Sequence, residues 1–425
     1  MKKLQLTPHL IMCLVGFSYI ASSSVIAPIL SIYLKDTVNI SIEMIGLITA
    51  MFFIASASAK LALGVFAGGK RTIACLVLAF VVYSICPMLY PLTGSAIMLL
   101  VVRATQGFAY AFIGTAALIL AGLTISSAER DKGVGTYTAF LSLGYLAGPG
   151  ITTFSVPLFG VANTFYFAGI VGFIGIFAST FLYRKLSAIE ESWQIVGVAV
   201  DREGLISKVP AILRNKMFAI GLIGNFAFFL LFGVLLAYSP LYVKENLHLG
   251  NELVSAFFIL YYMASTITRL SVGRIVASKK MGKQDLVTLS TALAAVFSFS
   301  LALAPNSVVF ACFFALIGAV QGVIFPGGSM LIAESIQPSR SVLANSLYMM
   351  GIDVGQGIAP LITASIVVQY GLAYAFITSA ATATVATLLL VMLNISRKGQ
   401  GERASKKRMM FCRKRPELRT TCTKA

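Results

Sequence analysis

Four charged residues lie inside long apolar stretches of this sequence, and these are the residues that could do chemistry. They are Lys60, Arg103, Arg269 and Asp353. A charged side chain at the centre of a bilayer costs about 2.5–3.5 kcal/mol on insertion scales, so such residues are usually paired or functional. A carboxylate removed from water can exchange a proton, and a cation there can hold an anion.

Asp353 is the only carboxylate that we place in the middle of an apolar segment. It lies about twelve residues from the end of its expected helix, or about 18 Å at a rise of 1.5 Å per residue. A short aspartate side chain does not reach the surface over that distance. We interpret Asp353 as the residue that carries a coupled proton, and the alternative is a structural, hydrogen-bonded aspartate.

Lys60 and Arg269 stand near the ends of their apolar segments, four residues before Gly64 and Gly273. Their long side chains can reach the surface from there, which is the alternative to a functional role. Two cations that face one cavity would favour an anionic or zwitterionic substrate.

The composition shows where these residues lie. Of the 425 residues, 58% are hydrophobic and 11% are charged, against about a quarter charged in a soluble domain. Apolar segments long enough to cross a membrane recur along the chain. We expect an all-α membrane protein, since only helices or closed barrels satisfy the backbone in lipid. The twelve expected helices are 8–34, 43–67, 72–91, 95–125, 133–158, 161–183, 217–243, 252–277, 285–304, 306–333, 341–369 and 372–394.

Basic residues gather in alternate loops, which predicts that both termini are cytoplasmic. The net charge of +18 is then a signal of topology and of anionic lipids at the cytoplasmic face, and no nucleic-acid partner is expected. The six cysteines form no CxxC pair, and no phosphate loop or HExxH motif occurs. We therefore expect no metal site, no cofactor and no enzyme activity.

The chain divides into four parts. We expect an N-terminal six-helix bundle over residues 1–184, a cytoplasmic linker over 185–216, a C-terminal six-helix bundle over 217–394 and a basic cytoplasmic tail over 395–425. The tail is expected to be a disordered arm that is attracted to anionic lipids.

The two six-helix parts resemble each other in sequence, as parallel repeats do in transporters. "AKLALGVFAGGKR" (59–71) matches "TRLSVGRIVASKK" (268–280), which makes Lys60 and Arg269 equivalent. Gln106-Gly107 matches Gln321-Gly322.

The fifth and eleventh expected helices match over a longer stretch. "TYTAFLSLGYLAGP" (136–149) matches "LYMMGIDVGQGIAP" (347–360). This alignment pairs three positions, namely Tyr137 with Tyr348, Gly144 with Gly355 and Pro149 with Pro360.

Over residues 8–394 the sequence resembles the major facilitator superfamily, in particular its drug:proton antiporter branch. "RATQGFAY" (103–110) is similar to the helix-four motif of that family. Gly135, Gly144 and Gly148-Pro149 are spaced as in the helix-five signature of exporting antiporters. The loop after the second helix, "GVFAGGKR", lacks the aspartate that the family usually has there.

The resemblance implies roles for the buried charges. Arg103 looks like the family arginine that assists proton coupling, with hydrogen bonding to neighbouring helices as the alternative. Nitrate porters and organophosphate antiporters of the superfamily have substrate-contacting cations at the places of Lys60 and Arg269. The second and eleventh helices face each other in this fold, so a Lys60–Asp353 ion pair is a further hypothesis.

Uncharged residues complete the set of candidates for a substrate cavity. They are Tyr19, Ser22, Gln106, Asn225, Tyr238, Gln321 and Tyr348. Each of these types is more often a helix-packing residue than a ligand contact.

The glycines of the fifth helix have a packing interpretation. At 100° per residue, Gly144 and Gly148 share a face and Gly135 lies opposite. We expect that face to contact helix 252–277 of the other half, and Gly148-Pro149 to allow a bend between moving halves. Gly355 and Pro360 repeat this arrangement in the eleventh helix.

The function that we predict is secondary active transport by alternating access, in the form of proton-coupled efflux of a small anionic, zwitterionic or amphiphilic molecule. The coupling ion is a proton or another ion. The chain would act as a monomer in the plasma (cell inner) membrane. Anion uptake or anion exchange is the alternative within the superfamily. A polytopic membrane enzyme or a receptor is the alternative outside it.

Overall fold

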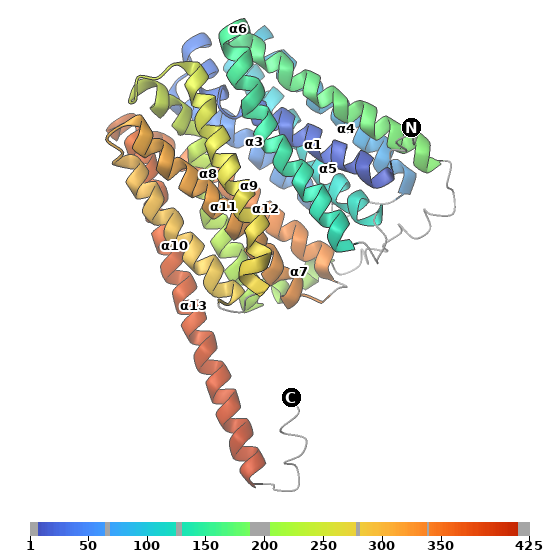
Figure 1. Ribbon diagram of the computed structural model, residues 1–425, viewed down its shortest axis with the longest axis vertical. Coiled ribbons are helices and arrows are strands. Elements are labelled where there is room, and N and C mark those ends of the chain that lie inside the picture. Colours follow the sequence, from blue (N-terminus) through green and yellow to red (C-terminus); the bar gives the residue numbers. More distant parts are fainter. Residues whose placement is uncertain are drawn as a thin grey trace.

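The structure is a computed structural model that describes residues 7–63, 69–124, 130–187, 205–277, 281–337 and 340–414. All regular secondary structure in these residues is helical (Figure 1). Among them, eleven helical segments are long and apolar enough to cross a membrane. The all-α fold expected from the sequence is confirmed.

The helices of the first half follow one another with short connections. They are α1 (Pro8–Ile26), α2 (Leu30–Ile32), the π-helical turn η1 (Tyr33–Thr37), α3 (Ile42–Leu63), α4 (Gly69–Leu89), the 3-10 turn η2 (Tyr90–Leu92), α5 (Ala96–Leu123) and α6 (Arg130–Ser187).

The second half has the same succession after one short helix. Its helices are α7 (Leu205–Leu213), α8 (Lys216–Glu245), α9 (Asn251–Ala277), α10 (Lys283–Ala302), α11 (Ser307–Ser335), α12 (Ser341–Tyr370) and α13 (Ala373–Lys414).

The long helix α6 contains two membrane crossings. Its backbone leaves the helical region at Gly160, where φ is +80° and ψ is 166°. A side chain is strained at such a φ, so glycine is the suitable residue. The segment before Gly160 runs parallel to α1, since Gly144 meets Phe17 and Gly148 meets Ser24. The segment after it runs antiparallel to α4. The chain therefore reverses at Gly160, so the described residues contain twelve candidate membrane crossings.

The two halves repeat each other in their contacts. A Cβ built on Gly144 would lie 2.7 Å from the carbonyl oxygen of Phe17, and one on Gly355 would lie 2.9 Å from that of Phe226. Phe17 and Phe226 are as far apart in the chain as Lys60 and Arg269. The predicted match of the fifth and eleventh helices is confirmed.

The match between the fourth and tenth helices is displaced by one turn. Gly107 packs against the carbonyl of Phe52, and the glycine that packs against the equivalent carbonyl, at Tyr261, is Gly318. Gly322 lies one turn further along and packs on Ser265 and Thr268. The identical dipeptides Gln106-Gly107 and Gln321-Gly322 therefore do not occupy structurally equivalent positions in the two halves.

The glycine face of the fifth helix does not contact α9, and this prediction was wrong. Gly144 and Gly148 pack against α1 of their own half, where a Cβ on either residue would collide with backbone. At Gly135 and Gly273 no atom lies within 4 Å of a built Cβ, so neither is a close-packing position in this conformation. Gly64 lies outside the described residues.

The bend expected at Gly148-Pro149 stays a prediction, and side chains of the first half donate to backbone carbonyls around it. Thr152 Oγ1 donates to the carbonyl of Val25 at 3.0 Å, and Thr153 Oγ1 donates to that of Pro149 at 2.9 Å. In α12 the carbonyl of Pro360 accepts a 2.7 Å hydrogen bond from Tyr238. Neighbouring groups thus satisfy the backbone around both prolines.

The linker and the tail are only partly described. Within 185–216 the structure describes α7, while residues 188–204 lie outside the described part. The tail was expected to be disordered, but α13 continues as a helix to Lys414 and extends well beyond the bundle (Figure 1). Residues 415–425 are not among the described ones.

Candidate functional site

Lys60 and Asp353 form an ion pair between the two halves. Lys60 Nζ on α3 lies 2.6 Å from Asp353 Oδ2 on α12. The Lys60 side chain is 13% exposed and the Asp353 side chain is 5% exposed. Ser56, one turn before Lys60, donates a 2.6 Å hydrogen bond to the same carboxylate oxygen. The structure thus brings the two predicted residues together.

The surroundings of this pair are mostly aromatic. Lys60 Nζ lies 6.0 Å from the ring centroid of Tyr110, which packs edge-on against Tyr19 at 5.4 Å. Tyr19, Tyr110 and Tyr145 lie near Asp353. Within the described residues, Asp353 is the only buried acidic residue. If Asp353 lost its charge, Lys60 would have no other buried acidic side chain among the described residues to pair with.

Arg103 is buried in a second polar cluster, on α5. Its guanidinium donates to Gln106 Oε1 at 3.1 Å and to the Tyr90 hydroxyl at 3.4 Å, and it lies 4.6 Å from the ring centroid of Phe52. Tyr90 also donates to Gln106 Oε1. Arg103 Nε and Gln106 Nε2 have no hydrogen-bond partner among the described residues. These two N–H donors of the cluster are therefore available to bind another molecule.

A cavity lies between the halves beside Arg103. Both halves supply its wall, which consists of Ser23, Ser24, Ile26, Ala27, Leu30, Thr49, Phe52, Phe53, Arg103, Tyr110, Tyr145, Phe229, Phe232, Leu236, Tyr262, Gln321 and Gln356. The wall contains seven aromatic residues and one cation, but no carboxylate. Its chemistry suits an apolar or aromatic molecule with a negative charge.

Arg269 occupies in α9 the place that Lys60 occupies in α3. Its guanidinium carbon lies 5.9 Å from the ring centroid of Phe325, and Tyr145 and Tyr261 lie near it. Its Nε has no hydrogen-bond partner, and no acidic side chain pairs with it in the described part of the chain. Arg269 does not line the cavity itself, although Gln321 and Tyr145 near it do.

The uncharged candidates Gln321, Asn225 and Tyr348 make two different kinds of contact. Gln321 lines the cavity and accepts a 3.1 Å hydrogen bond from Ser265. Asn225 donates to the carbonyl of Ile324 at 3.2 Å, and Tyr348 donates to that of Phe325 at 3.2 Å. Asn225 and Tyr348 therefore join helices of the second half, as polar residues in membrane proteins often do.

Sequence reasoning missed several residues of the site. Ser56 was not singled out, although it stands one helical turn before Lys60 and a side chain there shares its face. Tyr145 and Tyr262 stack across the two halves with ring centroids 4.9 Å apart. Their positions on α6 and α9 are equivalent to those of Gln356 and Phe53 in the α12–α3 contact, so the repeat could have indicated them.

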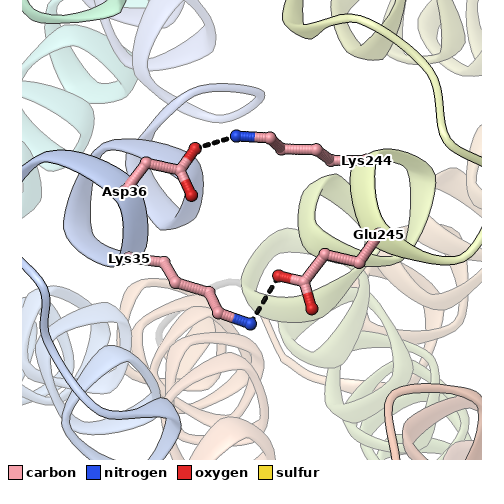
Figure 2. Close-up of polar contacts among 4 residues, drawn as sticks. All are labelled: Lys35, Asp36, Lys244 and Glu245. Atoms are coloured by element: carbon pink, nitrogen blue, oxygen red, sulfur yellow. Dashed lines mark hydrogen bonds and ion pairs between the residues drawn. The ribbon is translucent and has the colours of Figure 1, made fainter.

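Two ion pairs join the halves at the far end of the first and seventh crossings, and we call these four residues the clasp (Figure 2). Lys35 Nζ lies 2.5 Å from Glu245 Oε1, and Lys244 pairs with Asp36. Each half thus supplies one lysine and one acid. All four side chains are about a third exposed, so each pair contributes about 0–1 kcal/mol, as surface ion pairs do.

The clasp is formed by equivalent residues of the repeats. "YLKD" at the end of η1 matches "YVKE" at the end of α8. The chain leaves both segments through a residue with positive φ, Asn39 at 57° and His248 at 54°. The two pairs are therefore reciprocal, as in a two-fold symmetric interface. The clasp lies at the end of the bundle opposite to Pro8, since α1 and η1 lead from one to the other.

No group of histidine, cysteine and acidic side chains that could hold a metal ion occurs among the described residues. The candidate site therefore consists of the inter-half ion pair, the Arg103 cluster, the cavity, Arg269 and the clasp.

Comparison with known proteins identifies sequences that are related to this chain. The family model described as Major Facilitator Superfamily matches residues 12–318 and 277–421. An uncharacterized MFS-type transporter of Methanocaldococcus jannaschii is 24% identical over 336 residues, which are 78% of this chain and 83% of that protein. Multidrug resistance protein 2 of Bacillus subtilis is 22% identical over 284 residues, 64% of this chain and 67% of that one.

Solved structures with the same fold are also transporters. A mutant of the nucleoside transporter NupG aligns with a TM-score of 0.72 and 12% identity, covering 91% of this chain and all (100%) of that chain. A POT family transporter in complex with a thioalcohol-conjugated peptide gives 0.72 and 14%, covering 91% and 96%. At these identities the likeness shows the fold.

Proposed function

Because this chain belongs to the Major Facilitator Superfamily, we propose that it is a proton-coupled secondary transporter that exports a small anionic or amphiphilic molecule from the cell. Members of this family move solutes across membranes and are not enzymes. The chain is an integral, multi-pass membrane protein, and the plasma membrane is its proposed location.

The single observation that carries proton coupling is the Lys60–Asp353 ion pair. It is buried, it joins the two halves, and its acid is the only buried one in the described residues. Protonation of Asp353 would cancel the attraction and release α12 from α3. A proton would thus favour one arrangement of the halves over another, which is the requirement for coupling.

Transport by alternating access needs contacts between the halves that form and break. The clasp closes the end of the bundle opposite to Pro8, which the positive-inside rule assigns to the outside. The clasp must open when the cavity faces outward. Its modest strength, about 0–1 kcal/mol for each pair, suits a contact that must form and break in every transport cycle.

The cavity supports the class of substrate. An arginine with an unpartnered Nε, aromatic walls and no acid favour a molecule that has an apolar body and a negative charge. The same features disfavour a cationic drug, since the only charge on the wall would repel it.

The direction of transport is proposed from two resemblances. The spacing of Gly135, Gly144 and Gly148-Pro149 resembles the signature of exporting antiporters. The relative from Bacillus subtilis is named a multidrug resistance protein. Anion uptake or exchange is the second candidate, and the cations Arg103 and Arg269 favour an anion in either case.

A transport assay tests the proposal. Inside-out vesicles that contain the chain are given an imposed pH gradient and a panel of labelled aromatic and aliphatic anions, neutral analogues and cations. We expect accumulation of at least one anion that collapses when a protonophore removes the gradient. Movement that does not respond to the gradient would remove the antiporter assignment.

A further inference from the structure

The two halves carry equivalent cations, but only one of these cations has an acid. Lys60 pairs with Asp353 at 2.6 Å. Arg269 has an Nε without a partner and no ion pair in the part of the chain that the structure describes. Arg269 is half-buried inside a membrane bundle, where a cation without an anion is costly, so we ask which residue stands where an acid would pair with it.

The repeat shows which residue stands where that acid would be. Asp353 lies two residues before Gly355, and Ser142 lies two residues before Gly144. The two glycines make the same contacts with the first helix of their halves. Ser142, which is buried, is therefore the structural equivalent of Asp353.

The contacts between the halves lie at neighbouring places of the repeat on both sides. In the α12–α3 contact, Gly357, next to Gln356, packs on Phe53, and in the α6–α9 contact Tyr145 stacks on Tyr262. Arg269 follows Tyr262 by the same number of residues as Lys60 follows Phe53. From the repeat we therefore expect Ser142 to stand to Arg269 as Asp353 stands to Lys60.

We propose that the carboxylate of the substrate binds Arg269 beside Ser142, in the place that the Asp353 carboxylate takes beside Lys60. One half would then hold the coupled proton on a resident acid, and the other half would hold the substrate at the equivalent position. This inference rests on the proposed function, because it specifies the substrate of that transporter as a carboxylate.

Local chemistry favours a carboxylate at this position. The planar guanidinium of arginine binds a carboxylate through two parallel hydrogen bonds, and Nε is one of the donors that can take part. The Ser142 hydroxyl would provide a third donor, as Ser56 does for Asp353 at 2.6 Å. Tyr145 and Gln321 connect the site to the cavity, whose aromatic wall would receive the rest of the molecule.

The first test places an acid in the chain itself. In Ser142→Asp, the new carboxylate should pair with Arg269 and raise the melting temperature of the purified protein, whereas the neutral control Ser142→Asn should not. In an Arg269→Gln background, Ser142→Asp should lower the melting temperature. Equal effects of Ser142→Asp in both backgrounds would overturn the proposed register.

The second test uses benzoate as the probe, with benzamide as its neutral match and phenyl phosphate as the other anion. We expect benzoate to stabilise the unmodified protein, and its affinity to fall at least about tenfold in Ser142→Asp and Arg269→Gln. Stabilisation by benzamide alone, by phenyl phosphate alone or by none of the three would overturn the assignment. Equal binding of benzoate to Ser142→Asp would also overturn it.

These binding measurements use no ion gradient. If the protein binds benzoate through Arg269 but its transport does not depend on a pH gradient, the proposed proton coupling is refuted and the carboxylate site is supported. If the protein exports anions under a proton gradient, but Arg269→Gln binds benzoate as well as the unmodified protein does, the carboxylate site is refuted and the proposed transport is supported.

Discussion

Lys60 Nζ lies 2.6 Å from Asp353 Oδ2, although the two residues belong to opposite halves of the chain. The bond joins α3 and α12, whose contact also includes Gly357 against Ala50, Phe53 and Ile54. Under the proposed function, protonation of Asp353 would act on an interface between the halves. This relationship links the chemistry of a single carboxylate to the motion that transport requires.

Removing one partner of this pair should destabilise the protein. Lys60→Met leaves a buried carboxylate without its cation, and breaking a buried pair in this way costs about 3–5 kcal/mol. The double variant Lys60→Met/Asp353→Asn has no uncompensated charge and should recover most of the loss. Thermal unfolding of the purified variants measures both effects. A double variant no more stable than Lys60→Met would contradict the pairing.

Reversing one charge of the clasp should open the end of the bundle opposite to Pro8. We expect Lys35→Glu to raise the labelling rate of a cysteine at Ala27, which lines the cavity, by a membrane-impermeant thiol reagent in a chain without its native cysteines. The rise should be about two- to fivefold, the range that surface ion pairs allow. The swap Lys35→Glu/Glu245→Lys should restore the original rate.

The clasp experiment has a matched control within the same chain. Lys283 pairs with Glu334 between α10 and α11 of the second half. Lys283→Glu changes the net charge as Lys35→Glu does, but it breaks no contact between the halves. Labelling that rises equally in Lys283→Glu would show that the charge itself, and not the clasp, controls access.

The glycines of the fifth and eleventh helices should affect folding as well as transport. In Gly144→Ala the Cβ would come within 2.7 Å of the Phe17 carbonyl oxygen, so we expect a loss of about 1–3 kcal/mol from overpacking. Gly355→Ala should lose a similar amount. Gly135→Ala meets open space, and should be neutral or gain up to about 1 kcal/mol from helix propensity. Equal melting temperatures of all three would refute this packing account.

Much of the fold follows from local properties of the sequence. Length and hydropathy predict the crossings, because each helix must satisfy its own backbone in lipid. The reversal at Gly160 was also expected as the boundary between segments 133–158 and 161–183. The Lys60–Asp353 pair was a hypothesis that followed from the family resemblance, because the second and eleventh helices face each other in that fold, and the structure shows the two side chains in contact.

Other features depend on tertiary contacts that one sequence does not specify. The spacing of Gly144 and Gly148 shows that they share a face, but not that α1 would be the partner. Asn225 and Tyr348 have the residue types of ligand contacts, yet their donors are used by backbone carbonyls of α11. The clasp was not predicted, because Lys35 and Asp36 look like ordinary loop charges until Lys244 and Glu245 are placed opposite to them.

The central claim is that Asp353 carries the coupled proton, and Asp353→Asn tests it most directly. The variant is reconstituted in liposomes with an anion that the unmodified protein transports. Accumulation driven by an imposed pH gradient is compared with counterflow of the same anion at equal pH on both sides. The account predicts that Asp353→Asn loses gradient-driven accumulation but keeps counterflow. Gradient-driven accumulation equal to that of the unmodified protein would contradict it.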